Sequence, residues 1–374
     1  MRQSKFVVVS IGILYGVLVF WNFIRPVKEY SVSERRRLAQ RPELSVEQIF
    51  GGNYEKEVKN YIEKWENYIA DQFPGREWLR FWKNAFSVEV MQKLDVNGIY
   101  EKNGFLCAME YPVDERSLSR AAGIFRRIYE KNLKGTEAKG YLVIVPDKNY
   151  FLAGDTHLSM EYESFFETMY GKTEFLTAIS IADQLQITDY YKTDSHWRQE
   201  KLLDVAEAIQ AELGSGDVAE KGTEKYTIRR IEKPFYGVYY GQAALPVRPD
   251  TLCYCTGEAL EQYMVYDHEN KKEIPLYDME KAEGRDGYEM FLGGNASFVT
   301  ITNPLAVSEK ELVVFGDSFS RSLVPLLAEG YRKTTLYDIR YLPSASIGNY
   351  ITFTDQDVLF LYSTSVLNNS ITLK

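Results

Sequence analysis

The sequence predicts an α/β fold in which helices cover both faces of a mainly parallel, doubly wound β-sheet. Short apolar runs at residues 140–145, 312–315 and 357–362 support this prediction, because each is too short for a helix and rich in branched or aromatic residues. Such runs are typical of strands that are buried on both faces of a parallel sheet. Amphipathic segments lie between them, so we expect right-handed β–α–β crossovers.

The composition bounds the class of protein. The 374 residues have room for one large domain, or for one domain with additions. The net charge of −9 argues against nucleic-acid binding, which calls for a basic field. Only three Cys and three His are present, in no ligand-like spacing, so we expect no disulfide framework, no metal site and no cofactor.

The first segment along the chain is an apolar run at residues 6–24 that carries no charge. At 1.5 Å per residue, its 19 residues just cover a hydrocarbon core of about 30 Å. No small-x-small cleavage site precedes Arg25, so residues 1–29 are predicted to be an uncleaved, single-pass signal anchor. A count of basic flanking residues would keep the body in the cytoplasm, but long domains translocate largely regardless of such charge.

Residues 30–53 are predicted to be a tether, and residues 54–374 the α/β domain. An amphipathic helix is expected at 54–72, where apolar residues recur at spacings of 3 and 4, and a second helix follows Pro74-Gly75. Gly and Asn residues near 97–98 and 102–104 predict hairpin turns. Helices are then expected near 115–132, 159–170 and 199–213, with short strands near 185–187 and 334–339.

The sequence pattern changes near residue 214. Loop-like Gly and charged residues give way to four β-like pieces, at 226–231, 238–240, 252–255 and 288–291. We interpret residues from about 214 to 300 as a β-rich insertion in the α/β domain. The tyrosines of this insertion are candidates for lining a site and equally for packing.

A candidate nucleophile follows the strand at 312–315. The strand breaks at Gly316-Asp317-Ser318, and an amphipathic helix begins directly afterwards. A strand, a tight turn and a helix form the geometry that exposes a Ser hydroxyl and offers backbone N–H groups to a developing oxyanion. The alternative is that Asp317 or Ser318 only caps the helix.

A candidate base lies earlier in the chain. A serine nucleophile needs a neighbouring His, and that His needs a carboxylate to fix its tautomer. Asp194 stands two residues before His196, and residues i and i+2 of an extended segment point to the same side. The alternative is that Asp194 or Ser195 caps the next helix and that His196 is incidental.

The two motifs, GDSFS at 316–320 and TDSHW at 193–197, resemble the DHHW protein family and the related alginate O-acetyltransferases, which are circularly permuted and SGNH-hydrolase-like. The resemblance covers most of residues 30–365. It departs at Ser195, where the family often has His, and after Trp197, where a Thr and a Gly-Ala pair are usual. Further similar stretches are Ser33–Ala39, Asp71–Arg76, Asn97–Tyr100, Phe235–Gly237 and Gly293–Asn295.

The resemblance implies an SGNH-type O-acetyltransferase on the extracytoplasmic side of the cell membrane, acting on an exported polysaccharide or cell-wall glycan. Ser318 would be the nucleophile, His196 the general base and acid, and Asp194 the orienting carboxylate. A multi-pass membrane O-acyltransferase would supply the acyl group. The β-rich insertion would then be a candidate acceptor-binding lid.

Four further residues are candidates for substrate or oxyanion contacts, because they follow predicted strands or adjoin the motifs: Lys148, Trp197, Asn295 and Arg340. Lys148 has a solvated loop position as its alternative, and Asn295 a turn position. Two other functions stay open. One is a carbohydrate esterase with water as acceptor, and the other is a non-catalytic glycan-binding or scaffold component of a polysaccharide export system.

Overall fold

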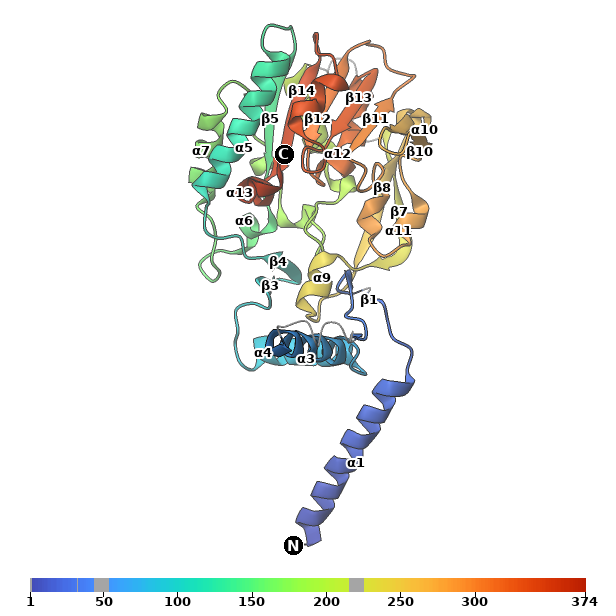
Figure 1. Cartoon of the computed structure of the whole chain (residues 1–374). Helices are drawn as coiled ribbons and strands as arrows, with labels where there is room; N and C mark the ends of the chain where they lie inside the picture. Colours follow the sequence, from blue (N-terminus) through green and yellow to red (C-terminus); the bar gives the residue numbers. More distant parts are fainter. Residues whose placement is uncertain (1, 32, 44–53, 215–224) are drawn as a thin grey trace. The chain divides into compact units, whose positions relative to one another are not determined.

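The computed structural model describes residues 2–31, 33–43, 54–214 and 225–374, without the side chains of residues 2–5, 8, 14, 15, 18, 19, 22 and 23. The chain divides into two units (Figure 1). One comprises Met1–Asn97 with Tyr240–Pro246, and the other comprises Gly98–Tyr239 with Val247–Lys374. The domain boundaries predicted from the sequence stay a prediction.

The first unit begins with helix α1 (Arg2–Ile24), which includes the predicted apolar segment. In the part of the chain that the structure describes, no helix was found with the length and apolar character of a membrane span. The predicted anchor therefore stays a prediction. Two antiparallel two-residue strands, β1 (Tyr30–Ser31) and β2 (Arg36–Arg37), lie within the predicted tether, and the rest of that tether at 44–53 is outside the described residues.

Two amphipathic helices complete most of this unit. The predicted helix at 54–72 is α3 (Tyr54–Asp71), and the second helix is α4 (Arg76–Glu89). Gly75, with a φ of 73°, separates them. This left-handed conformation explains the Gly between the two helices.

The second unit is built on a sheet in which eight strands are described, in the order β10-β9-β11-β13-β12-β14-β5-β6. The run from β13 to β6 is parallel, whereas β11 pairs antiparallel with both β13 and β9, and β9 with β10. The bounds are β5 (Lys139–Val145), β6 (Thr177–Ile179), β9 (Met264–Asp267), β10 (Lys272–Ile274), β11 (Phe298–Thr302), β12 (Glu311–Gly316), β13 (Lys333–Tyr337) and β14 (Asp357–Ser363).

Helices cover both faces of this sheet, as predicted. The side chains of Val143 and Val145 in β5 join a core that includes α8 (Leu203–Leu213) and α12 (Ser320–Leu327). The alternate residues Leu142 and Ile144 join the opposite core, with α5 (Glu115–Ile128) and α7 (Tyr162–Lys172). Because successive strand side chains point to opposite faces, the two cores lie on the two sides of one sheet.

Three of the predicted strands are wrong. Residues 185–186 lie between 3₁₀ turns at Ala182–Gln184 and Ile187–Asp189, and Ile187 begins the second turn. Residues 238–240 begin helix α9 (Val238–Ala243), and residues 288–291 lie largely in a 3₁₀ turn at Gly287–Met290. Periodicity cannot separate helix from strand in runs of three or four residues. The structure also splits the predicted insertion. Its first part forms an antiparallel ribbon of β7 (Thr227–Phe235) and β8 (Asp250–Thr256), whereas β9 and β10 extend the main sheet.

The remaining elements are short. The predicted hairpin is present as β3 (Ile99–Lys102) and β4 (Phe105–Ala108), turning at Asn103 and Gly104, which both have positive φ. The other helices are α6 (Lys148–Leu152), α10 (Glu258–Gln262), α11 (Met279–Ala282) and α13 (Thr364–Asn368).

Candidate active site

The turn that carries Ser318 sits between β12, which is flanked by two parallel partners, and α12. Asp317 is fully buried. One of its carboxylate oxygens accepts hydrogen bonds from the backbone N–H of Ser363 (2.8 Å) and from its hydroxyl (2.7 Å). The other accepts from the backbone N–H of Phe319 at 3.0 Å. Asp317 thus fixes the turn to the end of β14, while Ser318 stays partly exposed.

The structure brings Ser318, His196 and Asp194 into one hydrogen-bonded chain. Ser318 Oγ lies 2.8 Å from His196 Nε2, and His196 Nδ1 lies 2.6 Å from Asp194 Oδ1. A carboxylate on Nδ1 favours the tautomer in which Nδ1 carries the proton, so Nε2 is free to accept the proton of the Ser hydroxyl. This is the geometry of a nucleophile, a base and an orienting acid. The catalytic roles of the three residues stay a prediction.

Asp194 is held by a loop that the sequence did not assign to the site. Its Oδ2 accepts from the backbone N–H of Val238 at 2.8 Å. A Cβ placed on Gly237 would lie 2.2 Å from the Cβ of Asp194 and 2.4 Å from its Cα. Only glycine fits such an approach without a shift of the backbone. The Phe-Tyr-Gly stretch was noted as a resemblance, but nothing in it points to Asp194.

A buried carboxylate fixes the residue before Asp194. Asp250 accepts from the backbone N–H groups of Lys192 and Thr193, each at 2.8 Å, and from the hydroxyl of Thr193 at 2.6 Å. The Thr193 hydroxyl oxygen in turn accepts from the backbone N–H of Gly237 at 2.9 Å. Hydrogen bonds therefore hold both the backbone at residues 192–193 and the side chain of Thr193, next to Asp194.

The imidazole of His196 stacks on a tyrosine ring. The ring of Tyr288 lies parallel to it, with centroids 3.9 Å apart and planes 8° from parallel. The Tyr288 hydroxyl lies 2.9 Å from Ser322 Oγ on α12. Burial raises the pKa of Tyr288 above its ordinary value, so its hydroxyl is neutral at physiological pH. The sequence contains no signal for this contact, because residues 288–291 are predicted to form a strand.

Trp197 supports the site from inside the core. Its ring is fully buried, and its indole N–H donates to Phe319 O and Ser322 Oγ, each at 3.0 Å. Two hydrogen bonds therefore join the residue after His196 to the start of α12. The predicted substrate contact is replaced by a structural role, because a ring without exposed surface cannot meet a substrate.

Lys148 is also buried rather than solvated. Its side chain is 2 % exposed, and its Nζ donates to the carbonyl oxygens of Tyr191 (2.9 Å) and Lys192 (3.3 Å). Burial lowers the pKa of Lys148 to about 8, although the nearby charge of Asp194 acts in the opposite direction. Lys148 thus supports the segment that leads to Asp194. Its expected position in a solvated loop is wrong, whereas a role on the catalytic face stays a prediction.

The two remaining candidates have partners of their own. Arg340 binds Asp338 through Nε (3.0 Å) and Nη2 (2.8 Å); burial opposes its charge, but this bidentate carboxylate raises its pKa above the ordinary value. Asn295 is exposed, and its amide donates to Glu289 at 2.5 Å. Among the hydrogen bonds of the described residues, neither side chain reaches Ser318 or His196.

The backbone amides at the start of α12 are mostly used within the turn. The N–H of Phe319 donates to the Asp317 carboxylate, and the N–H of Ser320 donates to Asp317 O at 3.1 Å. In the described part of the chain, no acceptor is found for the N–H of Ser318. This N–H is therefore the donor at hand for the oxyanion that develops on an acyl carbonyl oxygen when Ser318 Oγ attacks the carbonyl carbon. Among the described residues, no group of His, Cys, Asp or Glu side chains could hold a metal ion.

Comparison with known proteins finds similarity at the level of the fold. No family model matches the sequence, and no curated protein matches it. A DHHW family protein from Eubacterium siraeum is similar in structure, with a TM-score of 0.58 and 21 % identity over 73 % of this chain and 93 % of the other. Bacillus cereus PatB1 is similar with a TM-score of 0.59 and 19 % identity, over 72 % and 96 % of the two chains.

A third structure, the O-acetyltransferase domain of Pseudomonas putida AlgJ, has a TM-score of 0.43 and 12 % identity over 74 % of this chain and 93 % of the other. So low a score carries no argument about this chain. The regions matched to the first two structures span 93 % and 96 % of those chains, so the similarity extends over nearly their whole folds. The predicted resemblance is confirmed at the level of the fold: the chain is similar to a DHHW family protein and to PatB1.

Proposed function

We propose that the protein is a serine-dependent, SGNH-type O-acetyltransferase that modifies an exported polysaccharide or cell-wall glycan. The observation that carries the proposal is the hydrogen-bonded chain from Ser318 Oγ to His196 and on to Asp194, at 2.8 and 2.6 Å. A scaffold protein has no need of this alignment. The polysaccharide acceptor is supported by the resemblance of the two sequence motifs.

The first half-reaction forms an acyl-enzyme. Ser318 Oγ attacks the acetyl carbonyl carbon while His196 Nε2 takes the hydroxyl proton, and Asp194 stabilises the imidazolium that results. The Ser318 N–H faces the oxyanion of the tetrahedral intermediate. The bond to the leaving group then breaks, the proton on His196 passes to the leaving group, and the acetyl group stays on Ser318 as an ester.

The second half-reaction transfers the acetyl group. A sugar hydroxyl gives its proton to His196 Nε2 as its oxygen attacks the Ser318 ester, and the proton returns to Ser318 Oγ when the ester bond breaks. With water in place of the sugar, the same steps give an esterase. The two activities therefore differ in the acceptor, a sugar hydroxyl or water, and not in the roles of Ser318, His196 and Asp194.

We further propose that residues 1–29 anchor the protein once in the cell membrane, with the catalytic unit on the extracytoplasmic side. A multi-pass membrane O-acyltransferase would deliver the acetyl group there. The uncharged apolar run at 6–24, the absence of a cleavage site after it and the family resemblance support this part of the proposal.

The test uses the purified full chain in detergent with p-nitrophenyl acetate as donor. Ser318→Ala is expected to lower kcat/KM by roughly 10³-fold or more, because it removes the nucleophile. The control Ser119→Ala removes an exposed hydroxyl that donates to Glu115 O within α5, and is expected to leave the rate unchanged. Equal rates for wild type and Ser318→Ala would contradict the proposed Ser318-dependent enzyme and favour the scaffold function.

A second arm separates transferase from esterase. Adding soluble glycan fragments is expected to speed release of nitrophenol and to place acetyl groups on the fragments, as detected by mass spectrometry. Hydrolysis that gains nothing from any added glycan would point to the esterase.

A further inference from the structure

Large exposed apolar side chains gather on one side of α4 and on the residues directly after it. Trp78, Trp82, Phe86 and Val90 recur every four residues, so they share one face of the helix. We define the α4 face as these residues together with Leu79, Met91 and Leu94. Every member is at least 43 % exposed. Large apolar residues gathered on a surface in this way mark an interaction site, whereas scattered ones do not.

The opposite side of α4 is already occupied. Asn84 is buried and donates its amide hydrogen to Ala243 O at 2.8 Å, and Arg80 donates to Gly241 O at 2.9 Å. These contacts lie within one unit, so α4 is seated with its polar side inward. The outward apolar face is therefore the reverse of the usual amphipathic arrangement, in which the apolar stripe faces the core.

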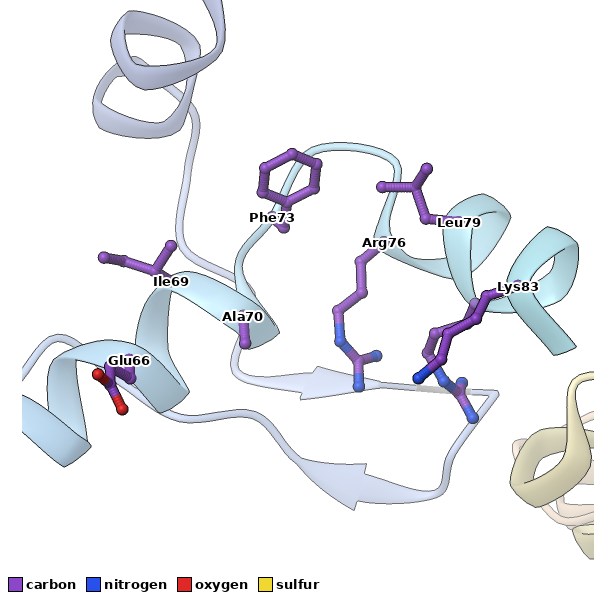
Figure 2. Close-up of a pocket in the computed structure, with 8 residues that line it drawn as sticks. Glu66, Ile69, Ala70, Phe73, Arg76, Leu79 and Lys83 are labelled. Atoms are coloured by element: carbon purple, nitrogen blue, oxygen red, sulfur yellow. The ribbon is translucent and has the colours of Figure 1, made fainter. Parts of the chain in front are cut away.

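A hollow of about 500 Å³ adjoins this face, between α3 and α4 (Figure 2). Its lining includes the apolar side chains of Ile69, Phe73 and Leu79, the basic side chains of Arg76 and Lys83, and the acidic side chain of Glu66. Arg76 is paired with Glu34 at 2.8 Å, and Lys83 is exposed. An exposed apolar surface that is rich in Trp, with charged residues at its border, is the composition of a segment that lies at a bilayer interface.

The segment after α1 is hydrogen-bonded to the corner between α3 and α4. Gln72, which is buried at this corner, accepts from the Lys28 backbone N–H at 3.0 Å and donates to Lys28 O at 2.8 Å. The guanidinium of Arg25 also donates to Gln72 O. The chain that leaves the proposed anchor is thus fastened to the unit that bears the α4 face, and Trp21 and Ile24 at the end of α1 are exposed as well.

We propose that the α4 face binds the surface of a lipid bilayer, with its Trp and Phe side chains at the level of the headgroups and first methylenes. Tryptophan favours this zone because its ring is apolar and its N–H is polar. Lipid is favoured over a second copy of the chain because the anchor segment already ties this unit to the membrane. The inference rests on the anchor in the proposed function.

The experiment uses single-cysteine labels on the full chain, reconstituted in vesicles of phosphatidylcholine and phosphatidylglycerol. The native thiols Cys107, Cys253 and Cys255 are each at most 3 % exposed, so an introduced thiol is labelled selectively with an environment-sensitive fluorophore. Phe86→Cys and Leu94→Cys report on the α4 face, at two sites so that one misfolded variant does not decide the outcome. Lipids with a nitroxide near the headgroup serve as the quencher for these two labels, and lipids with a nitroxide deep in the acyl chain serve for a label within α1.

Two control labels separate the inference from the anchor. Ile13→Cys reports on α1, and Val307→Cys, at a side chain that is 85 % exposed in the other unit, is the matched exposed apolar position. We expect the labels at 86, 94 and 13 to lose roughly half or more of their emission and the label at 307 to lose none.

Quenching at 13 without quenching at 86 and 94 would keep the anchor and overturn the inference. Absence of quenching at all of these positions would overturn both. A third outcome also overturns the inference: emission at 86 that shifts to the blue with protein concentration but is not quenched by lipid, which would assign the face to a second copy.

Discussion

Substitution of Gly237 by alanine should disable the site without touching any of the three residues in it. An added Cβ would lie 2.2 Å from the Cβ of Asp194, 2.4 Å from its Cα and 2.5 Å from its Oδ2. The Cα is a backbone atom, so rotation of the Asp194 side chain cannot relieve the contact. The loop at 237–238 or the segment at 193–194 must move, and the hydrogen bond from the Val238 N–H to Asp194 Oδ2 is strained with it.

The expected loss follows from the size of this shift. A movement of about 1 Å near the reacting atoms costs about 10²-fold in rate, and loss of the carboxylate's orienting role costs up to about 10⁴-fold. We therefore expect kcat/KM for p-nitrophenyl acetate to fall by between roughly 10²- and 10⁴-fold. Overpacking should also lower the free energy of unfolding by about 1–3 kcal/mol.

The assay compares Gly237→Ala with Gly171→Ala, whose added Cβ meets nothing within 4 Å. Both variants are measured for kcat/KM and for urea-induced unfolding, so that loss of fold is separated from loss of alignment. The control should keep its activity. A Gly237→Ala enzyme that is folded and retains more than about half of the wild-type kcat/KM would contradict this prediction, because the site would then tolerate displacement of Asp194.

Three more predictions concern the supports of the site. Tyr288→Leu removes the ring stacked on His196 and should lower kcat about 10-fold with little change in KM, whereas Tyr288→Phe keeps the ring and should lose less than about 3-fold; steady-state kinetics decide. Lys148→Met should remove a pH-dependent contribution to the free energy of unfolding. Because burial lowers the pKa of Lys148 from 10.5 to about 8, the unfolded chain binds more protons between these values, so wild-type stability should rise with pH there relative to the variant, as urea titrations at several pH values can measure. Asp317→Asn places an amide against the N–H and hydroxyl of Ser363 and should cost about 1–3 kcal/mol of unfolding free energy, measured by the same titrations, and an unchanged midpoint would contradict it.

Those parts of the fold that have a local signal were predictable from the sequence. The strand at 312–315, the turn at Ser318 and the helix after it follow from an apolar run, a glycine and a change of period, all within a few residues. The pairing of Asp194 with His196 is local in the same sense. The contact of His196 with Ser318 spans 122 positions, and chemistry alone suggested it, since a serine nucleophile needs a base.

The supports of the site were not predictable, because burial and partners are properties of the fold. Trp197 and Lys148 were expected to meet substrate from their place beside the motifs, yet both lie in the interior and hold backbone segments together. Tyr288 and Val238 were read as strand residues from short apolar runs, whereas their actual neighbours come from distant segments. A short run carries no information about which segment will cover it.

The α4 face shows a second limit of local patterns. The sequence predicts a second helix after Pro74-Gly75, and the apolar stripe of such a helix usually faces a core. In the structure, the inward contacts of α4 are made by Asn84 and Arg80, and the large apolar residues Trp78 and Trp82 point outward. Periodicity locates a face but does not say what the face contacts.

In the proposed function, Ser318 carries the acetyl group between donor and acceptor. The most direct measurement is peptide mass spectrometry of the full chain, quenched in acid within the first turnovers with p-nitrophenyl acetate. We predict a single acetyl ester on the peptide that contains Ser318, absent from Ser318→Ala and lost when glycan acceptor is added before quenching. Acetylation at another residue at the same rate, or persistence of the adduct in Ser318→Ala, would contradict the account.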